Sequence, residues 1–446
     1  MLSVLSDRRY CHLFLAQVVA LLGTGLATVA LALLAFDLAG ADAGLVLGTA
    51  LTIKMIAYVV IAPVAGAFAD RVPRRSMLVA LDLVRAGAAL ALPFVTQIWQ
   101  IYVLIFILQA ASAAFTPTFQ ATIPDILKDE DDYTKALSLS RLAYDLESLL
   151  SPMLAALLLA FLAFDTLFVG TAIGFLASAL LVVSVVLPSP RPAERRGIYA
   201  RTTQGMRIYI ATPRLRGLLA LCLSVAAAGA MVIVNTVVLV RDGLGLPEDA
   251  VALTFGAFGA GSMLVALGLP RLLDASGDRP VMLAGTALMT LTLAVLGAGM
   301  TAGMMEGVVG WGALLAGWFL IGAGYAAALT PSGRLLRRSS HAEDRPAIFA
   351  AQFALSHACW LVTYPLAGWL QTAFGGAVAL FALSALSALG LMAAVRLWPA
   401  FDPAEISHVH DDLPADHPHL SGTARHSHAF VIDDLHKRWP ETGRLS

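Results

Sequence analysis

Between its second and third long apolar stretches, the chain reads Gly66-Ala67-Phe68-Ala69-Asp70-Arg71-Val72-Pro73-Arg74-Arg75. The hydrophobic run before this turn stops at Asp70, three arginines follow, and the next hydrophobic run starts at Met77. Two membrane helices that are joined so closely need a sharp turn, with its basic residues held outside the lipid. The arginines alone are also what the positive-inside rule predicts for any short cytoplasmic loop. The stretch therefore predicts a membrane protein with a tight, basic turn at this point.

The spacing within the turn carries more information than its charge. Gly66, Asp70, Arg71 and the pair Arg74-Arg75 are spaced as in the loop signature of the major facilitator superfamily, which this stretch closely resembles. In that family the loop joins helices two and three, and its acid and basic residues form a charge lock that holds the transporter closed on the cytoplasmic side. The resemblance implies this gating role here. Pro73 replaces the glycine before the basic pair, which predicts a stiffer turn.

Composition places the chain in a membrane. Hydrophobic residues make up 59% of the 446 and charged residues 13%, and the mean hydropathy is +0.79. Soluble chains have about 45–50% apolar and 25% charged residues. Windows of roughly 20 apolar residues predict twelve membrane-spanning helices. Their expected bounds are 12–36, 44–69, 76–96, 99–121, 136–160, 164–187, 217–240, 248–271, 279–300, 308–330, 345–372 and 375–398.

The basic residues predict the orientation. Seven arginines lie in the connection 188–216 and four in the turn 331–345, whereas Arg241 is the one basic residue outside the apolar runs on the other side. Lysine and arginine near span ends set topology. We therefore expect both termini and the central connection to be cytoplasmic, in a multi-pass protein of the inner membrane. The first apolar run shows no obvious cleavage site after Arg9 and predicts a helix, not a signal peptide.

Three features recur about two hundred residues apart and in the same order. The matched pairs are Asp70 with Asp274 (before Arg74 and Arg279), Thr116-Pro117 with Thr330-Pro331, and Ser151-Pro152 with Tyr364-Pro365. Such duplication is how facilitator-type transporters build two bundles around a central site. The predicted fold is an all-α membrane protein with twelve transmembrane helices in two pseudo-symmetric six-helix bundles. The expected parts are a first bundle (1–187), a cytoplasmic linker (188–216), a second bundle (217–398) and a flexible tail (399–446).

Charged residues inside spans are costly and are candidates for coupling or substrate binding. Lys54 lies deep in span two, and span five offers Arg141, Asp145 and Glu147 as partners. Arg141 and Asp145 are four residues apart and share a helix face, so they could also be a purely structural pair. Glu147 points away from Asp145. Family members place spans one, two, four and five around the cavity, which implies that one of the two carboxylates faces it.

Other residues in the spans support more than one interpretation. His357 in span eleven is either a packing residue or a site residue. Pro152 and Pro365 are expected to bend their helices, which serves packing as well as gating. Asp82 and Arg85 in span three are expected to anchor the basic turn. Many proton-driven antiporters of the superfamily carry an arginine in span four, whose place is taken here by Phe106, so proton coupling would have to use other residues.

The tail from residue 399 has a different composition, in which Pro, Asp and His replace the aliphatic residues. Seven of the chain's ten histidines lie there: His408, His410, His417, His419, His426, His428 and His436. Such tracts suit zinc, nickel or cobalt, and the tail resembles the histidine-rich C-termini of some nickel and cobalt exporters of the superfamily. The alternative is a polar tail that only keeps the C-terminus soluble.

These observations predict a secondary transporter that works by alternating access, a proton-coupled exporter or antiporter of a small molecule or a divalent metal ion. The alternatives are an importer of the same fold and a transport-inactive membrane sensor that reads metal through its tail. Nucleotide-binding and catalytic signatures are absent from the sequence, so we expect neither an enzyme nor a resident cofactor. The expected partners are the lipid bilayer, protons and the substrate, with no nucleic acid, for a monomeric protein. Cys11, Cys222 and Cys359 are far apart in sequence and indicate neither a disulfide framework nor a zinc knuckle.

Overall fold

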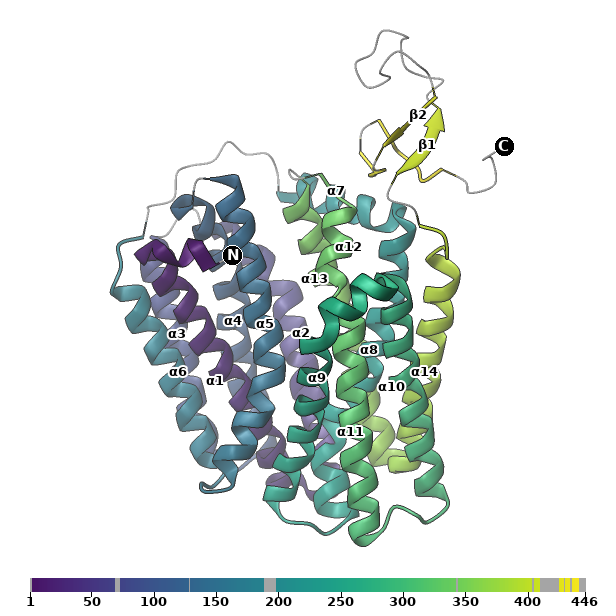
Figure 1. The fold of residues 1–446 in the computed structure, drawn as a ribbon. Coiled ribbons are helices and arrows are strands. Elements are labelled where there is room, and N and C mark those ends of the chain that lie inside the picture. Colours follow the sequence, from purple (N-terminus) through teal and green to yellow (C-terminus); the bar gives the residue numbers. More distant parts are fainter. Residues whose placement is uncertain are drawn as a thin grey trace.

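The computed structural model describes residues 2–68, 73–127, 129–187, 198–341, 344–402, 405–409, 425–428, 430–433 and 435–440. Six long helices form the first bundle (Figure 1): α1 (Arg8–Ala39), α2 (Ala43–Phe68), α3 (Arg74–Ala91), α4 (Ile98–Ile126), α5 (Glu130–Leu159) and α6 (Asp165–Val183). Six more form the second bundle: α8 (Pro213–Val237), α9 (Glu248–Ser276), α10 (Asp278–Thr301), α11 (Gly307–Leu329), α13 (Arg345–Phe374) and α14 (Gly376–Leu397).

Two shorter helices and several single turns complete the bundles. The helix α7 (Ile198–Ala211) precedes the second bundle, and α12 (Ser332–Arg338) lies between α11 and α13. The short helical turns are η1 (Leu2–Ser6), η2 (Gly40–Asp42), η3 (Leu92–Phe94) and η4 (Val238–Gly243). The linker expected at 188–216 thus contains a helix of its own, and within it residues 188–197 lie outside the described part of the chain.

The predicted all-helical architecture of two six-helix bundles is observed. Each of the twelve predicted spans corresponds to one long helix. Ten described stretches are long and apolar enough to cross a membrane, and one of them, Arg8–Ile61, contains both α1 and most of α2. The helix α5 is not among the ten, and its first half is rich in charged residues. Its length of 30 residues corresponds to about 45 Å of helix, which is longer than the hydrocarbon core of a bilayer.

Glycines end helices where the chain must reverse. Gly277 (φ +77°) separates α9 from α10, and Gly375 (φ +81°) separates α13 from α14. Both have a positive φ, which costs glycine nothing because it lacks a Cβ atom. At the start of the first bundle, the Asp7 carboxylate accepts hydrogen bonds from the backbone N–H groups of Arg9 and Tyr10 and caps α1. The helix bounds therefore follow from local backbone chemistry as well as from the apolar runs.

The two bundles meet along two seams, α2 against α13 and α5 against α9. The N-terminus and the strands β1 and β2 lie at the same end of the molecule, which we call the terminal end (Figure 1). Close contact is made at the opposite end, where α2 begins and α13 finishes. A Cβ atom added to Gly368 would lie 2.2 Å from the backbone oxygen of Gly44, and one added to Gly48 would lie 2.7 Å from that of Tyr364. Glycines therefore bring the two backbones together there.

The described residues of the tail include two short strands. The strands β1 (Ile406–Val409) and β2 (Arg425–His428) pair antiparallel, with His408 opposite His426. Phe430 and Ile432 are buried in the same apolar cluster as residues of α8 and α12. These few apolar side chains dock the described part of the tail onto the terminal end of the second bundle.

Candidate functional site

The basic turn that suggested the fold is described only in part. Asp70 and Arg71 lie outside the described residues, and Gly66 lies in the last turn of α2. Arg74, at the start of α3, is buried and forms an ion pair with Asp125 near the end of α4. Arg75 donates a hydrogen bond to the carbonyl of Val183 at the end of α6. These two arginines therefore tie α3 to its neighbours at the terminal end of the first bundle.

Two turns further along α3, Asp82 and Arg85 form an enclosed ion pair. Asp82 is 0% exposed, accepts a 2.8 Å hydrogen bond from Ser178 Oγ of α6, and pairs with Arg85. The guanidinium of Arg85 lies over the rings of Phe115 (4.1 Å) and Phe175 (4.5 Å). The charge pair, hydroxyl and rings satisfy one another inside one bundle. This arrangement supports a structural role that anchors α3 to α4 and α6.

The segment of the second bundle that matches the basic turn, at Asp274 and Arg279, makes different contacts from those of Arg74 and Arg75. Arg279, in the first turn of α10, donates hydrogen bonds to the backbone oxygens of Trp398 (3.0 Å) and Val395 (3.3 Å) at the end of α14. It thereby caps a helix C-terminus, where a cation interacts favourably with free carbonyls. Asp278 forms the ion pair of this region, with Arg334 of α12 at 3.3 Å. Asp274 lies in the last turn of α9.

Lys54 of α2 and Glu147 of α5 form a pair of opposite charges within the spans, called the charge pair below. Lys54 and Glu147 interact electrostatically, and both side chains are partly buried. The side chains of Arg141, Asp145 and Pro152 lie outside the described residues. The sequence offered Arg141, Asp145 and Glu147 as partners of Lys54, and of these the one with a described side chain, Glu147, interacts with it electrostatically.

Gly25 of α1 makes room for the acidic member of this pair. A Cβ atom there would lie 3.2 Å from Glu147 Oε1 and 2.0 Å from Ser151 Oγ. A side chain at this position would clash with α5, so the absence of one allows α1 to pass close to Glu147. The sequence did not single out this glycine as a site residue. A glycine facing a charged neighbouring helix was the signal that could have identified it.

Aromatic residues of the second bundle approach the charge pair. Tyr364 of α13 interacts electrostatically with both Glu147 and Tyr325 of α11, so it links the pair to the other bundle. On the same seam, the ring of Tyr58 in α2 stacks on that of His357 in α13 at 5.6 Å. The sequence named Tyr364 only as part of a repeated pair with Pro365 and predicted none of these tyrosines as a site residue, because tyrosine in a span is also an ordinary packing residue.

His357 is held within an aromatic group. Its Nδ1 lies 2.7 Å from the backbone oxygen of Phe353, one turn earlier in α13, and the two rings lie 3.9 Å apart. Since a carbonyl oxygen only accepts, Nδ1 is the donor and Nε2 is left to accept. Pro365 also lies inside α13, as the sequence predicted. His357 therefore contacts both helices of the α2–α13 seam, and its Nε2 can accept a hydrogen bond.

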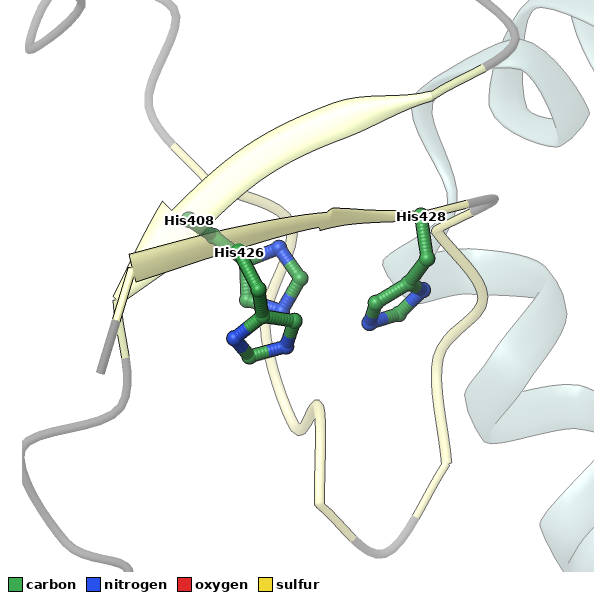
Figure 2. Close-up of side chains that lie close together, drawn as sticks. All are labelled: His408, His426 and His428. Atoms are coloured by element: carbon green, nitrogen blue, oxygen red, sulfur yellow. The ribbon is translucent and has the colours of Figure 1, made fainter. Parts of the chain in front are cut away.

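The histidines of the tail come together. His408 on β1 and His426 and His428 on β2 offer ring nitrogens that all lie within 4.8 Å of one another (Figure 2). His436 joins them, with its Nε2 3.0 Å from that of His408. The pKa of His408 is lowered to about 4, mainly by burial. The hydrogen bond to the backbone oxygen of Ile406 opposes this shift, and the three neighbouring imidazoles add to it. His410, His417 and His419 lie outside the described residues.

Known proteins resemble this chain in sequence and in fold. The family model of the Major Facilitator Superfamily matches residues 13–268 and 218–421. The chain belongs to this superfamily. Its members are secondary transporters and not enzymes, so that expectation is confirmed. The protein is therefore a multi-pass membrane transporter for a small-molecule substrate.

Two curated relatives are similar in sequence. The uncharacterized MFS-type transporter YfiS of Bacillus subtilis (strain 168) is 25% identical over 307 residues, which are 66% of this chain and 70% of that protein. Macrolide efflux protein A of Streptococcus pyogenes is 26% identical over 149 residues, which are 32% of this chain and 36% of that protein. The second match therefore spans only about a third of the efflux protein.

Solved structures are similar in fold. The nucleoside transporter NupG has a TM-score of 0.63 at 13% identity, covering 87% of this chain and 98% of that one. A D-xylose-proton symporter has a TM-score of 0.63 at 17% identity, covering 88% and 98%. At such identities the likeness shows the fold alone.

Proposed function

We propose that this superfamily member is a proton-coupled exporter of a small organic molecule and that Glu147 carries the proton. The observation that supports it is the electrostatic interaction of Glu147 in α5 with Lys54 in α2 of the same bundle and with Tyr364 in α13 of the other bundle. Alternating access moves the bundles relative to each other, so it changes what surrounds this carboxylate. A carboxylate whose cationic partner moves away binds a proton, and releases it when the partner returns.

The described surroundings of the pair suit an organic substrate. Tyr364 interacts electrostatically with Glu147 and with Tyr325, and its ring lies 4.9 Å from that of Trp360. Such rings bind apolar and cationic organic groups. Among the described residues, the tail cluster is the one group of three or more His, Cys, Asp and Glu that could hold a metal ion. We therefore favour an organic substrate over a metal ion, in line with the partial similarity to a macrolide efflux protein.

The distribution of arginines supports an orientation with the terminal end in the cytoplasm. Arg207, Arg214, Arg334 and Arg338 lie at this end, on α7, α8 and α12. At the opposite end Arg241 pairs with Glu248 at 3.3 Å. The positive-inside rule then places the N-terminus and the tail in the cytoplasm. Export would carry the substrate from the terminal end to the opposite end.

The test is transport by the purified protein in vesicles with an imposed pH gradient. Macrolides and other organic amphiphiles are offered together with nickel, cobalt and zinc ions. We expect gradient-driven movement of an organic compound, reduced at least tenfold in Glu147→Gln, which corresponds to about 1.4 kcal/mol. Glu248→Gln is the matched control, because Glu248 is the first residue of α9, lies at the opposite end of the molecule and is partly exposed. Gradient-dependent transport that persists in Glu147→Gln contradicts the proton role.

The same experiment separates the alternatives. Movement of metal ions but of no organic compound would favour a metal exporter. Uptake against the proposed direction would favour an importer, and no movement of any compound would favour a sensor. Export of an organic compound that does not respond to the pH gradient would retain the substrate class and remove the coupling.

A further inference from the structure

The contacts of His408 and His436 leave two lone pairs facing each other. His408 Nδ1 lies 3.0 Å from the backbone oxygen of Ile406, and His436 Nδ1 lies 2.9 Å from Asp433 Oδ1. Carbonyl and carboxylate oxygens accept hydrogen bonds, so both Nδ1 atoms donate. In the neutral rings, both Nε2 atoms then carry lone pairs, and they lie 3.0 Å apart. This approach is favourable only if a cation lies between the two nitrogens.

Two further imidazoles complete the surroundings of that point. The rings of His426 and His428 lie 4.5 Å and 4.7 Å from that of His408, and the ring of His428 lies 5.1 Å from that of His436. All three strand histidines project to one side of the hairpin (Figure 2). This follows from the pairing register, which sets His408 opposite His426, and from the strand period of two, which puts His428 on the same face.

We infer that His408, His426, His428 and His436 form a four-imidazole site for one divalent transition metal ion, which fixes the tail to the terminal end of the second bundle. Zinc–nitrogen bonds of about 2.0–2.1 Å at tetrahedral angles separate the ligand nitrogens by about 3.3 Å. The observed pair at 3.0 Å is close to this value. The remaining nitrogens, within 4.8 Å, need only small side-chain rotations to reach it. Imidazole ligands in this geometry favour Zn²⁺, with Co²⁺ as its spectroscopic substitute.

The outer contacts match those of bound histidine ligands. A metal-bound histidine almost always donates its other N–H to a carbonyl or a carboxylate, as His408 does to Ile406 and His436 to Asp433. Asp433 also accepts from the backbone N–H of His436 at 2.7 Å and lies 3.2 Å from His341. The carboxylate is therefore fixed both to the ligand and to the segment that follows α12.

The metal would supply stability that the hairpin lacks. Each strand has four residues, and a two-stranded sheet of this size is marginal in water. The ligands lie against Phe430, whose ring is 5.0 Å from that of His408 and 4.7 Å from that of His436. Phe430 belongs to the buried cluster of α8 and α12. Metal binding at the histidines thus continues directly into the docking of the tail.

The test uses the full chain, purified in detergent and stripped of metal by a chelator. We expect about one tightly held Zn²⁺ per chain by elemental analysis, and a tetrahedral visible spectrum with Co²⁺. His408→Ala and His436→Ala are expected to weaken binding at least tenfold. The matched control is the double variant His417→Ala and His419→Ala, which removes one His-x-His unit of the same tail and should retain the ion. Asp433→Asn tests the outer contact and should weaken binding by about ten- to a hundredfold.

A second variant distinguishes the loss of a metal ligand from misfolding of the tail. His408→Cys offers a thiolate, which also binds zinc and cobalt. We expect it to retain one ion and to add a sulfur-to-cobalt charge-transfer band. Equal loss in the His417/His419 variant and in His408→Ala would overturn the four-imidazole site in favour of chelation by successive His-x-His units. Failure of the unmodified chain to retain any ion would overturn metal binding altogether.

Discussion

The guanidinium of Arg214 and the carboxylate of Asp402 lie 3.4 Å apart and join the first turn of α8 to the segment after α14. Their side chains are 3% and 12% exposed. Asp402 is also 3.5 Å from Arg338 of α12, and Trp439 lies 4.8 Å from the Arg214 guanidinium. One carboxylate thus connects two helices of the second bundle to the start of the tail.

Asp402→Asn should loosen the tail. The change leaves Arg214 buried without its anionic partner, which costs about 3 kcal/mol. We expect a protease to cut the segment after residue 402 faster in the folded variant than in the folded unmodified protein. Glu405→Gln is the control, because Glu405 is exposed three residues further on. Equal cleavage rates in both variants would show that this ion pair does not hold the tail.

Asp82→Ala should destabilise the first bundle. It removes the partner of Arg85 in an enclosed site and leaves a buried cation, with an expected loss of about 3–5 kcal/mol. Asp132→Ala is the matched control, because Asp132 and Lys135 form an ion pair with the same three-residue spacing at 41% and 38% exposure. Its expected effect is below about 1 kcal/mol. Thermal unfolding in detergent measures both. A small shift for Asp82→Ala would contradict the anchoring role.

Gly368→Ala should hinder closure of the bundles at the opposite end. The added methyl group would meet the backbone of α2 at Gly44, and backbone atoms cannot move aside as a flexible side chain can. Overpacking of this kind costs about 1–3 kcal/mol, so we expect transport to fall roughly tenfold. Gly87→Ala, where the methyl group has open space, is the control and should transport normally. Normal transport by Gly368→Ala would mean that α2 and α13 need not approach this closely.

Asp70→Asn should reduce turnover while leaving the protein in the membrane. The spacing of Gly66, Asp70 and Arg71 resembles the gating loop of the superfamily, in which the acid is part of a charge lock. Neutralising it removes one side of that lock. Membrane abundance by immunoblot and transport in the vesicle assay give the two readouts. Unchanged turnover would reduce the loop to a topology signal.

Much of the architecture could be predicted because the bilayer acts as a solvent with strict demands. Lipid accepts only long apolar helices, so twelve runs of about 20 apolar residues predict twelve spans. The turn at 66–75 indicated the family through its spacing. Lys54 and Glu147 could be selected because charged side chains are rare inside spans.

The partners of individual side chains could not be predicted in the same way. Arg279 matched Arg74 in the sequence repeat, yet it caps α14, because its neighbours belong to a helix more than a hundred residues away. Gly25 and Tyr364 beside Glu147 escaped selection, since small and aromatic residues are common in every span. Arg74 contacts Asp125 because the start of α3 lies beside the end of α4, which is decided by packing and not by spacing along the chain.

The tail shows the same difference between what the sequence predicts and what only the tertiary structure decides. The sequence by itself determined that seven histidines stand among acids beyond the last span, and hence that this segment offers ligands for a borderline metal. Spacing along the chain suggested His-x-His pairs as the units. Only the tertiary structure decided that His408 meets His426, His428 and His436. The reason is physical: strand register and the burial of Phe430 set distances across the chain, and neither is written in the separation of residues along it.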